Sequence, residues 1–489
     1  MAENKNAFVG FIGPSYTTRI GRFDRQRSIN LYLEMDALGY GKDKEVAMLI
    51  SCPGVKLQDT IGSGPIRAIY VPSSRQDLMY VISGAEVWLY SDLTTKTKLV
   101  GTMLTTDTPV SIADNGTSVM WVDGTHGYYH SFADTTFHLI NDAHFYPAST
   151  ITFQDGYFIL NQTDSGYFFL SNLYDTTFYS LNEANQSGVA DNLVGLICNN
   201  RELYLFGESS TEIWWNQGAS GVSPFSRQDG KFIQYGCASA QTIKALDNSI
   251  FWLAKNPEGG GFVFTMKGDQ PQRISNHAIE FALRSYGDLS GASAWVYQED
   301  GHTFYVLDIP GAPTTWVFDG MTQQWHERQS NVAGDTVASI RTQHAYYKSQ
   351  HVVGDKTAGK IYLQSLEIND EAGAPFVRTR QSPHVADNLK MIFFGLLEID
   401  FKFGVGLNAG VGVPQNAIDP RAILEISNDG GETWGNPLYA RLGKLGDNYA
   451  RARWQRLGRS RDRIFRVSVS DPVQVAMIGA ELDVNEGTA

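Results

Sequence analysis

Arginine is concentrated in one short stretch near the end of the chain. Residues 448–467, NYARARWQRLGRSRDRIFRV, contain seven arginines and one acidic residue, Asp462, in a protein whose formal net charge is −13. A guanidinium binds carboxylates and phosphates through paired hydrogen bonds. The stretch could therefore hold a phosphate, a substrate carboxylate or an acidic protein surface.

The arginines in this stretch fall into groups that alternate with other residues. Alternate side chains on extended backbone point to the same face, so each group is expected to present one face. We predict that six of them form a surface that binds an adjacent subunit or another acidic partner: Arg451, Arg453, Arg456, Arg459, Arg461 and Arg463. Two alternatives are a solvated face of weak ion pairs and direct contact with DNA, to which Trp454 could add stacking.

A second pattern, SNDGGETW at residues 427–434, resembles the Asp-box turn of sialidases and related propeller proteins. In that turn, Asp and Ser side chains bond backbone amides, a glycine adopts a left-handed conformation and the tryptophan packs beneath. The resemblance implies a structural turn rather than a reactive site. Its residues here are Ser427, Asp429, Gly431, Thr433 and Trp434.

A sialidase-like or carbohydrate-binding propeller is the alternative function. Such an enzyme would have several boxes spread over its blades, an arginine trio for the sugar carboxylate and a tyrosine nucleophile. This sequence has one box, and it has no early Arg-Ile-Pro motif. We therefore predict that the protein is not an enzyme.

Two other patterns have simpler structural interpretations. GVGLNAG at residues 404–410 is followed by two prolines and a strand, whereas a dinucleotide loop leads into a helix N-terminus. Four histidines lie within 19 residues in segments typical of strands, where residues i and i+4 are about 13 Å apart. They are His126, His130, His138 and His144. We predict no bound metal and no cofactor.

Composition limits the class of protein. The chain has 489 residues, 48 of them glycine, with 10 Trp, 23 Tyr and 26 Phe, and it has few long helical patterns, which favours an all-β fold. The three cysteines, Cys52, Cys198 and Cys237, are few and far apart, as in a reducing compartment. The acidic balance argues against nucleic-acid binding over the whole surface, and no segment is typical of a signal peptide or a membrane span.

The middle of the chain repeats a hairpin pattern seven times. Apolar and aromatic runs that meet at Gly, Asn or Asp turns start at residues 77, 117, 155, 200, 247, 301 and 345. The intervals of 38 to 54 residues are close to the roughly 40 to 50 residues of a four-stranded propeller blade. We predict a β-propeller of six or seven blades over residues 66–370, with a pair of stacked sandwiches as the rival arrangement.

The flanking segments differ from the repeats. LEIDFKFGVGL, from residue 397, alternates strictly and predicts one long half-buried strand. We expect residues 371–489 to form a β-sandwich-like platform and residues 1–65 to pack on it. One short helix is predicted within SNHAIEFALRSYGDL, residues 275–289, capped by Ser275 and supported by a Glu280–Arg284 pair.

Three stretches carry a family resemblance through their order along the chain. They are DRQRSINLYLE with ISCPGV near the start, RISNHAIEFAL in the middle, and a terminal block that runs from LLEIDFKFGVG to RIFRVSVSDPV. Together they resemble the packaged-DNA stabilisation proteins of short-tailed bacteriophages (podoviruses), which are the tail accessory or nozzle proteins of the tail machine.

The resemblance implies a structural virion protein that forms a ring, expected to be a hexamer, below the portal and its adaptor. The ring would continue or close the DNA channel, retain the packaged DNA, let DNA pass without sequence specificity, and carry a needle, fibres or spikes. It would act in the virion tail after assembly in the host cytoplasm. A closed ring needs two unlike subunit faces, and the basic stretch could supply one of them.

Overall fold

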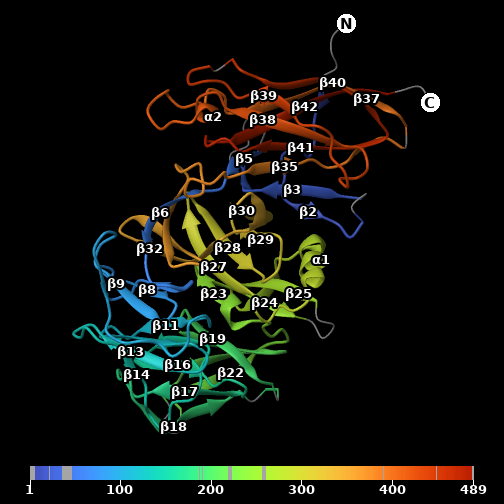
Figure 1. Cartoon of the computed structure of the whole chain (residues 1–489). Coiled ribbons are helices and arrows are strands. Elements are labelled where there is room, and N and C mark those ends of the chain that lie inside the picture. Colours follow the sequence, from blue (N-terminus) through green and yellow to red (C-terminus); the bar gives the residue numbers. More distant parts are fainter. Residues whose placement is uncertain are drawn as a thin grey trace.

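The computed structural model describes residues 6–20, 23–35, 47–186, 188–189, 191–218, 223–255, 260–388, 390–447 and 449–486. They form two bodies, a β-propeller and a β-sandwich platform, with strands from the start of the chain lying between them (Figure 1). The helical elements of this described part are α1 (His277–Tyr286), α2 (Gln415–Ile418) and the 3-10 turn η1 (Ala240–Thr242). The predicted all-β fold is confirmed.

The described residues form a propeller of seven four-stranded antiparallel blades, of which six are separate sheets and one, β27–β30, is part of a larger sheet. The first strand of each sheet contacts the first strand of the next, around a closed ring, so these strands line the axis. From the innermost strand outward, the first blade contains β7 (Ile66–Tyr70), β8 (Met79–Ser83), β9 (Glu86–Tyr90) and β10 (Lys96–Lys98), and the second contains β11 (Ser111–Asp114), β12 (Ser118–Val122), β13 (Gly127–Ser131) and β14 (His138–Leu139). The third blade contains β15 (Ile151–Gln154), β16 (Tyr157–Asn161), β17 (Tyr167–Ser171) and β18 (Phe178–Asn185), and the fourth contains β19 (Leu193–Asn199), β20 (Glu202–Gly207), β21 (Thr211–Asn216) and β22 (Phe225–Ile233). The fifth blade contains β23 (Lys244–Leu246), β24 (Ser249–Lys255), β25 (Gly261–Lys267) and β26 (Gln270–Arg273).

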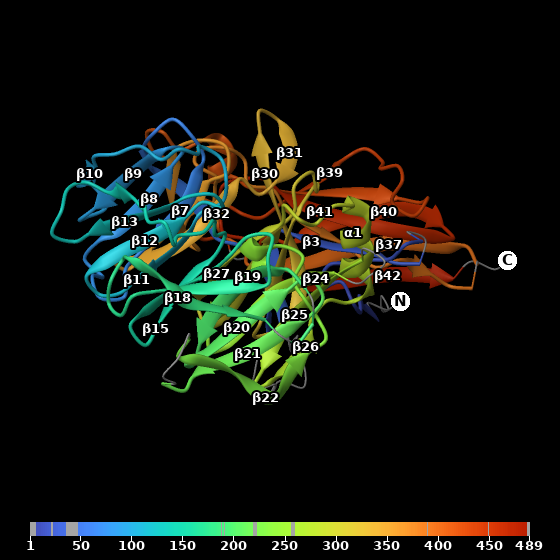
Figure 2. The same cartoon turned by 90° about the horizontal axis from the view of Figure 1, so that it is seen from below.

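The sixth blade extends beyond the propeller. Its strands are β27 (Ser293–Glu299), β28 (His302–Asp308), β29 (Thr315–Asp319) and β30 (Gln324–Val332). The outermost strand, β30, also pairs with β31 (Asp335–Ala338), and this hairpin projects beside the platform (Figure 2).

The seventh blade is closed by a strand from the start of the chain. Its strands are β32 (Arg341–Tyr347), β33 (Gln350–Asp355), β34 (Lys360–Ser365) and β6 (Gly54–Thr60). Without β6, the edge of β34 would expose unpaired backbone groups. Residues 54–60 therefore belong to the propeller, whereas we had expected the whole of residues 1–65 to pack on the platform.

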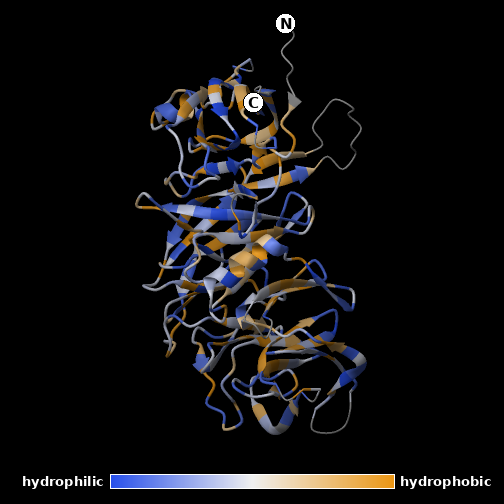
Figure 3. Cartoon of the chain, turned by 90° about the vertical axis from the view of Figure 1, so that its right-hand side faces the viewer, coloured by the Kyte–Doolittle hydropathy of each residue, from blue (hydrophilic) through white to orange (hydrophobic). Residues whose placement is uncertain are grey.

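The blades are held together by apolar side chains that pack between neighbouring sheets. The run FYVL, residues 304–307, has no side chain more than 2% exposed, which explains why its sequence lacks alternation. Strands β8 and β12 are likewise buried along their whole length, while hydrophobic and hydrophilic segments are interspersed over both bodies as a whole (Figure 3). Cys52 and Cys237 are buried free thiols, and burial raises the pKa of Cys237 to about 11.

The platform is a sandwich of two sheets around a separate apolar core. One sheet contains β1 (Asn6–Ala7), β4 (Leu31–Met35), β5 (Ala47–Ser51), β37 (Ile392–Phe401), β40 (Ala452–Ser460) and β42 (Ala476–Glu486). The other contains β2 (Tyr16–Thr17), β3 (Arg25–Ile29), β35 (Arg378–Gln381), β36 (Val385–Ala386), β38 (Arg421–Ser427), β39 (Leu438–Arg441) and β41 (Asp462–Val469). Phe394 and Leu397 from the first sheet pack with Phe465 and Val467 from the second.

The second platform sheet is continuous with the sixth blade. Strand β3 pairs in parallel with β30 and antiparallel with β35, so one hydrogen-bonded sheet runs from β27 to β39. The Asn30 side chain donates to the carbonyls of Gln329 and Val377, at 3.0 and 2.8 Å. The two bodies therefore share a backbone connection as well as side-chain contacts.

Arg380 anchors the start of the chain to β35. Its fully buried guanidinium donates to the carbonyl oxygens of Gly10 at 2.9 Å, Phe11 at 2.5 Å and Pro14 at 2.9 Å, and to the Ser28 hydroxyl at 3.1 Å. Burial lowers the pKa of Arg380 to about 9. The charge is compensated mainly by backbone dipoles, so this segment of backbone is fixed by one side chain.

Arg378, on the same strand, makes a similar set of contacts with other parts of the chain. Its guanidinium donates to the carbonyl oxygens of Asn369 at 3.1 Å and Asp471 at 3.0 Å, and also to those of Phe376 and Val473. Burial lowers the pKa of Arg378 to about 10. It connects the chain that leaves the propeller to the loop that follows β41.

Two local predictions need correction. The helix is capped by Asn276, whose side chain accepts from the Ile279 amide at 3.1 Å, and Glu280 pairs with Arg273 of the preceding strand instead of Arg284. The alternating strand ends at Phe401, because Gly404 has a φ of +70° and its amide donates to a carbonyl in the β39–β40 connection.

An ionic triad, with His302 and Asp319 buried and Glu34 partly exposed, crosses from the sixth blade to the platform. The His302 ring contacts the Asp319 carboxylate through Nδ1 at 2.8 Å and the Glu34 carboxylate, on β4, through Nε2 at 2.7 Å. Burial opposes the charged ring, but hydrogen bonds and charge from both carboxylates outweigh it and raise the pKa of His302 to about 9. The buried imidazolium is thus part of the junction at neutral pH.

We predict that Arg380→Met lowers the free energy of unfolding by at least about 3 kcal/mol, because several buried carbonyl groups lose their donor. Urea denaturation measures the change. Arg201→Met, at a side chain that is 83% exposed, is the control and should change stability by less than about 0.5 kcal/mol. Equal stability of the two variants would contradict the anchoring role.

The triad predicts a specific pH dependence. A group whose pKa is higher in the folded state stabilises the fold fully below its unfolded pKa of 6.5, and this contribution disappears as pH rises through about 9. The stability difference between the natural protein and His302→Gln should therefore shrink by about 3 kcal/mol between pH 6 and pH 10. Denaturation curves across that range measure it, and a constant difference would contradict the charged triad.

Candidate assembly surface

The arginine-rich stretch turns a corner between the two platform sheets. Strand β40 lies in one sheet and β41 in the other, with Arg461 between them. The corner lies at the edge where β37 begins at Ile392 and where β40 and β42 both end, near the C label in Figure 1. The alternation expected for a continuous extended segment is therefore interrupted, and the arginines separate into three environments.

Arg451 and Arg453 are paired within the chain. Arg451 Nη1 lies 3.0 Å from Glu398 Oε1, and Arg453 Nε lies 2.9 Å from Oε2 of the same carboxylate. Glu398 sits directly opposite Arg453 on the neighbouring strand and is 8% exposed. These two arginines are partly neutralised before any partner binds.

Arg456, Arg459 and Arg461 are exposed at the corner. Arg456 occupies a β-bulge with a φ of +57°, which bends the strand and separates its side chain from the regular alternation. None of the three makes a side-chain hydrogen bond or ion pair with the described residues. We define Arg456, Arg459 and Arg461 as the basic corner.

Arg463 is directed into the protein and is 3% exposed. Its guanidinium donates to Asn428 Oδ1 at 2.9 Å, to the Leu457 carbonyl at 2.7 Å and to the Arg459 carbonyl at 3.2 Å, and it lies 4.2 Å from the centre of the Phe394 ring. Burial lowers the pKa of Arg463 to about 10. It supports the basic corner from beneath, so we remove it from the predicted contact surface.

The SNDGGETW segment forms a closed turn beside this corner. The Asp429 carboxylate accepts from the Glu432 and Thr433 amides, each at 3.0 Å, and Ser427 Oγ accepts from the Gly431 amide at 2.8 Å. The hydrogen bond from the Thr433 hydroxyl is the main reason why the pKa of Asp429 lies well below its usual range. The Ser427 and Asp429 side chains therefore form hydrogen bonds within the turn, which agrees with a structural role.

The turn is tied to the N-terminal segment by a contact that the sequence pattern did not reveal. Gly431 has a φ of +85°, and a side chain there would meet the Arg25 side chain at about 3.1 to 3.2 Å. Arg25 donates to the Gly430 carbonyl at 3.0 Å and pairs with Glu432 at 2.8 Å. Trp434 is covered by the Arg466 guanidinium, 3.9 Å from the ring centre.

The other sequence motifs occupy separate places. His126, His138 and His144 contact aspartates at 3.8, 3.0 and 3.5 Å, and the buried His130 hydrogen-bonds to the Tyr80 hydroxyl. No cluster of His, Cys, Asp or Glu suited to a metal ion occurs within the described ranges. Residues 404–410 form an irregular loop before the four-residue helix α2. No helix among the described residues is long and apolar enough to span a membrane.

Fold and surface define a propeller that carries a sandwich platform with an exposed basic corner. A family model described as "Bacteriophage P22 Gp10, beta-propeller" matches residues 13–368, and one described as "Bacteriophage P22 Gp10, beta-sandwich" matches residues 378–485. The chain belongs to this bacteriophage P22 Gp10 family, and it is a packaged-DNA stabilisation, or tail accessory, protein of a short-tailed phage. It is therefore a structural protein of a virion.

Solved structures with low identity also align with the chain. The β-propeller domain of Cps50 (Swd1) from Myceliophteria thermophila is 9% identical, covers 64% of this chain and 99% of its own, and has a TM-score of 0.42. YCF48 from Cyanidioschyzon merolae is 10% identical, covers 63% and 98% of the respective chains, and has a TM-score of 0.41. No curated protein matches the chain.

We predict opposite outcomes for two neighbouring arginines. Arg463→Met should lower the free energy of unfolding by about 2 to 4 kcal/mol, because buried carbonyl acceptors lose a charged donor. Arg461→Met, the matched control, should change it by less than about 0.5 kcal/mol. Chemical denaturation measures both, and a harmless Arg463→Met would contradict the supporting role.

Proposed function

We propose that the protein forms a closed ring, a hexamer, at the phage neck below the portal and its adaptor. The ring continues or closes the DNA channel, helps to retain the packaged genome, and carries a tail needle, fibres or spikes. Membership of the bacteriophage P22 Gp10 family over both bodies of the chain is the observation that carries this proposal.

The basic corner contributes one of the two unlike faces that a closed ring requires. The side chains of Arg456, Arg459 and Arg461 have no partner among the described residues, on a chain with 52 acidic and 39 basic residues. An acidic surface on the adjacent subunit or on the adaptor complements such a corner, and paired guanidinium–carboxylate bonds tolerate burial at an interface.

The excess of acidic residues suits the proposed DNA channel. A net charge of −13 repels phosphate, so DNA slides through a lumen without lasting contacts or sequence specificity. Subunits assemble in the host cytoplasm onto filled heads. In this role the protein acts by positioning partners and obstructing DNA, without catalysis.

We expect the triple variant Arg456→Glu, Arg459→Glu and Arg461→Glu to remain folded and to fail to attach to heads. The assay uses DNA-filled heads that carry portal and adaptor but lack this protein, with negative-stain imaging of the neck and measurement of released DNA. The natural protein should form a six-fold collar and reduce DNA release, because the corner meets an acidic surface.

The matched control reverses three exposed charges on the propeller, Lys267→Glu, Arg284→Glu and Lys360→Glu, which gives the same net charge. The control should assemble normally. Normal assembly by the corner variant would remove the basic corner from the interface, and failure of the natural protein to bind the neck would contradict the ring itself.

A further inference from the structure

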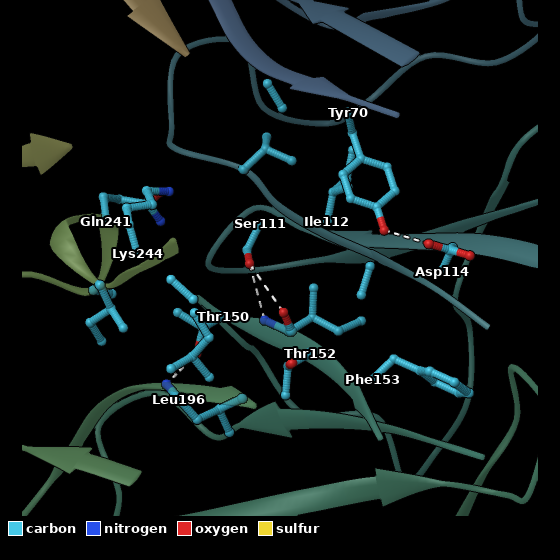
Figure 4. Close-up of a pocket in the computed structure, with 18 of the residues that line it drawn as sticks. Tyr70, Ser111, Ile112, Asp114, Thr150, Thr152, Phe153, Leu196, Gln241 and Lys244 are labelled. Atoms are coloured by element: carbon cyan, nitrogen blue, oxygen red, sulfur yellow. Dashed lines mark hydrogen bonds between the residues drawn. The ribbon is translucent and has the colours of Figure 1, made fainter. Parts of the chain in front are cut away.

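A polar cavity of about 430 Å³ opens around the propeller axis. It is lined by the innermost strands β7, β11, β15, β19 and β23, by the turn η1, and by Gln343 of the seventh blade. Its volume falls in the range of roughly 300 to 1,000 Å³ that is typical of small-molecule sites. In Figure 4, Gln241 and Lys244 lie on one wall, and Tyr70 and Asp114 lie on the opposite wall.

The two charged residues that line the cavity differ in their partners. Asp114 is saturated: its carboxylate accepts from the Tyr70 hydroxyl at 2.5 Å, the Ser73 amide at 3.1 Å and the Ser74 hydroxyl at 3.1 Å. The Lys244 side chain has no hydrogen bond or ion pair with any described residue, and burial lowers its pKa to about 8. The cavity therefore contains an uncompensated ammonium group at neutral pH.

Two neutral amides share this lack of partners. Neither the Gln241 nor the Gln343 side chain hydrogen-bonds to a described residue. Gln343 has a φ of +48° at a register shift between β32 and β33, so a bulge places this residue at the cavity wall. Bulges that redirect a side chain occur next to functional sites more often than elsewhere. An amide can both donate to and accept from a hydroxyl group.

We propose that this axial cavity binds a small organic carboxylate that also carries hydroxyl groups, such as a sugar acid. The carboxylate pairs with Lys244, and the hydroxyl groups hydrogen-bond to Gln241 and Gln343. The Lys244 ammonium group favours a negatively charged ligand, and the two amides favour a ligand with several hydroxyl groups. This site lies in the propeller, on a different body from the basic corner, and does not depend on the ring assembly.

The test is calorimetric titration of the full chain with D-glucuronate, and with D-glucose and inorganic phosphate as separate probes. D-glucuronate should bind with one-to-one stoichiometry and at least about tenfold more tightly than either of the others. Lys244→Met should weaken D-glucuronate binding at least about tenfold, because it removes the charge-assisted bond. Lys244→Arg, which keeps the charge, should retain most of the affinity.

Lys360→Met is the matched control, because it removes a lysine from the outer part of the seventh blade, and it should bind like the natural protein. Lys244→Met should also melt no lower than the natural protein without ligand, since it removes an unpaired charge. Gln343→Leu should weaken D-glucuronate and leave the Lys244 pKa unchanged. Absence of D-glucuronate binding, equal binding by Lys244→Met, or equally tight binding of glucose or phosphate would overturn the proposal.

Discussion

Strand β35 holds two fully buried guanidinium groups whose hydrogen-bond acceptors are mainly backbone carbonyls, and both bodies of the molecule are built around it. Arg380 fixes the start of the chain, and Arg378 fixes the segments that leave the propeller and follow β41. A buried cation without a carboxylate is stable only where many dipoles converge on it. The carbonyl acceptors come from segments far apart in the sequence, so the two guanidinium groups require these segments to adopt one relative arrangement.

That arrangement makes the propeller and the platform continuous. The sheet passes from blade six through β3 and β35 to β41, and β41 begins at the basic corner. The charged triad of His302 joins the same blade to the other platform sheet. A load applied to the corner in the proposed ring would therefore reach the propeller through paired backbone, rather than through a flexible linker.

The repeat architecture was predictable from sequence because each hairpin is local and its apolar runs recur at a nearly constant spacing. The strand that closes the propeller was not predictable, because β6 pairs with β34 about 300 residues away and the sequence of β6 has no feature that indicates this pairing. The environments of the arginines were also hidden. A prediction from periodicity holds only for a continuous strand. Here a bulge at Arg456 and a change of sheet at Arg461 leave some arginines exposed and others buried or paired.

The basic corner and Lys244 both carry positive side chains without a partner among the described residues, and they differ in their exposure to solvent. Arg456, Arg459 and Arg461 are exposed at an outer corner, where an unpaired guanidinium is tolerated and a large protein partner can approach. Lys244 lies in a confined cavity, where an unpaired ammonium is destabilising and only a small ligand fits. The same charge thus suits assembly at the corner and ligand binding at the axis, because access and desolvation differ between the two places.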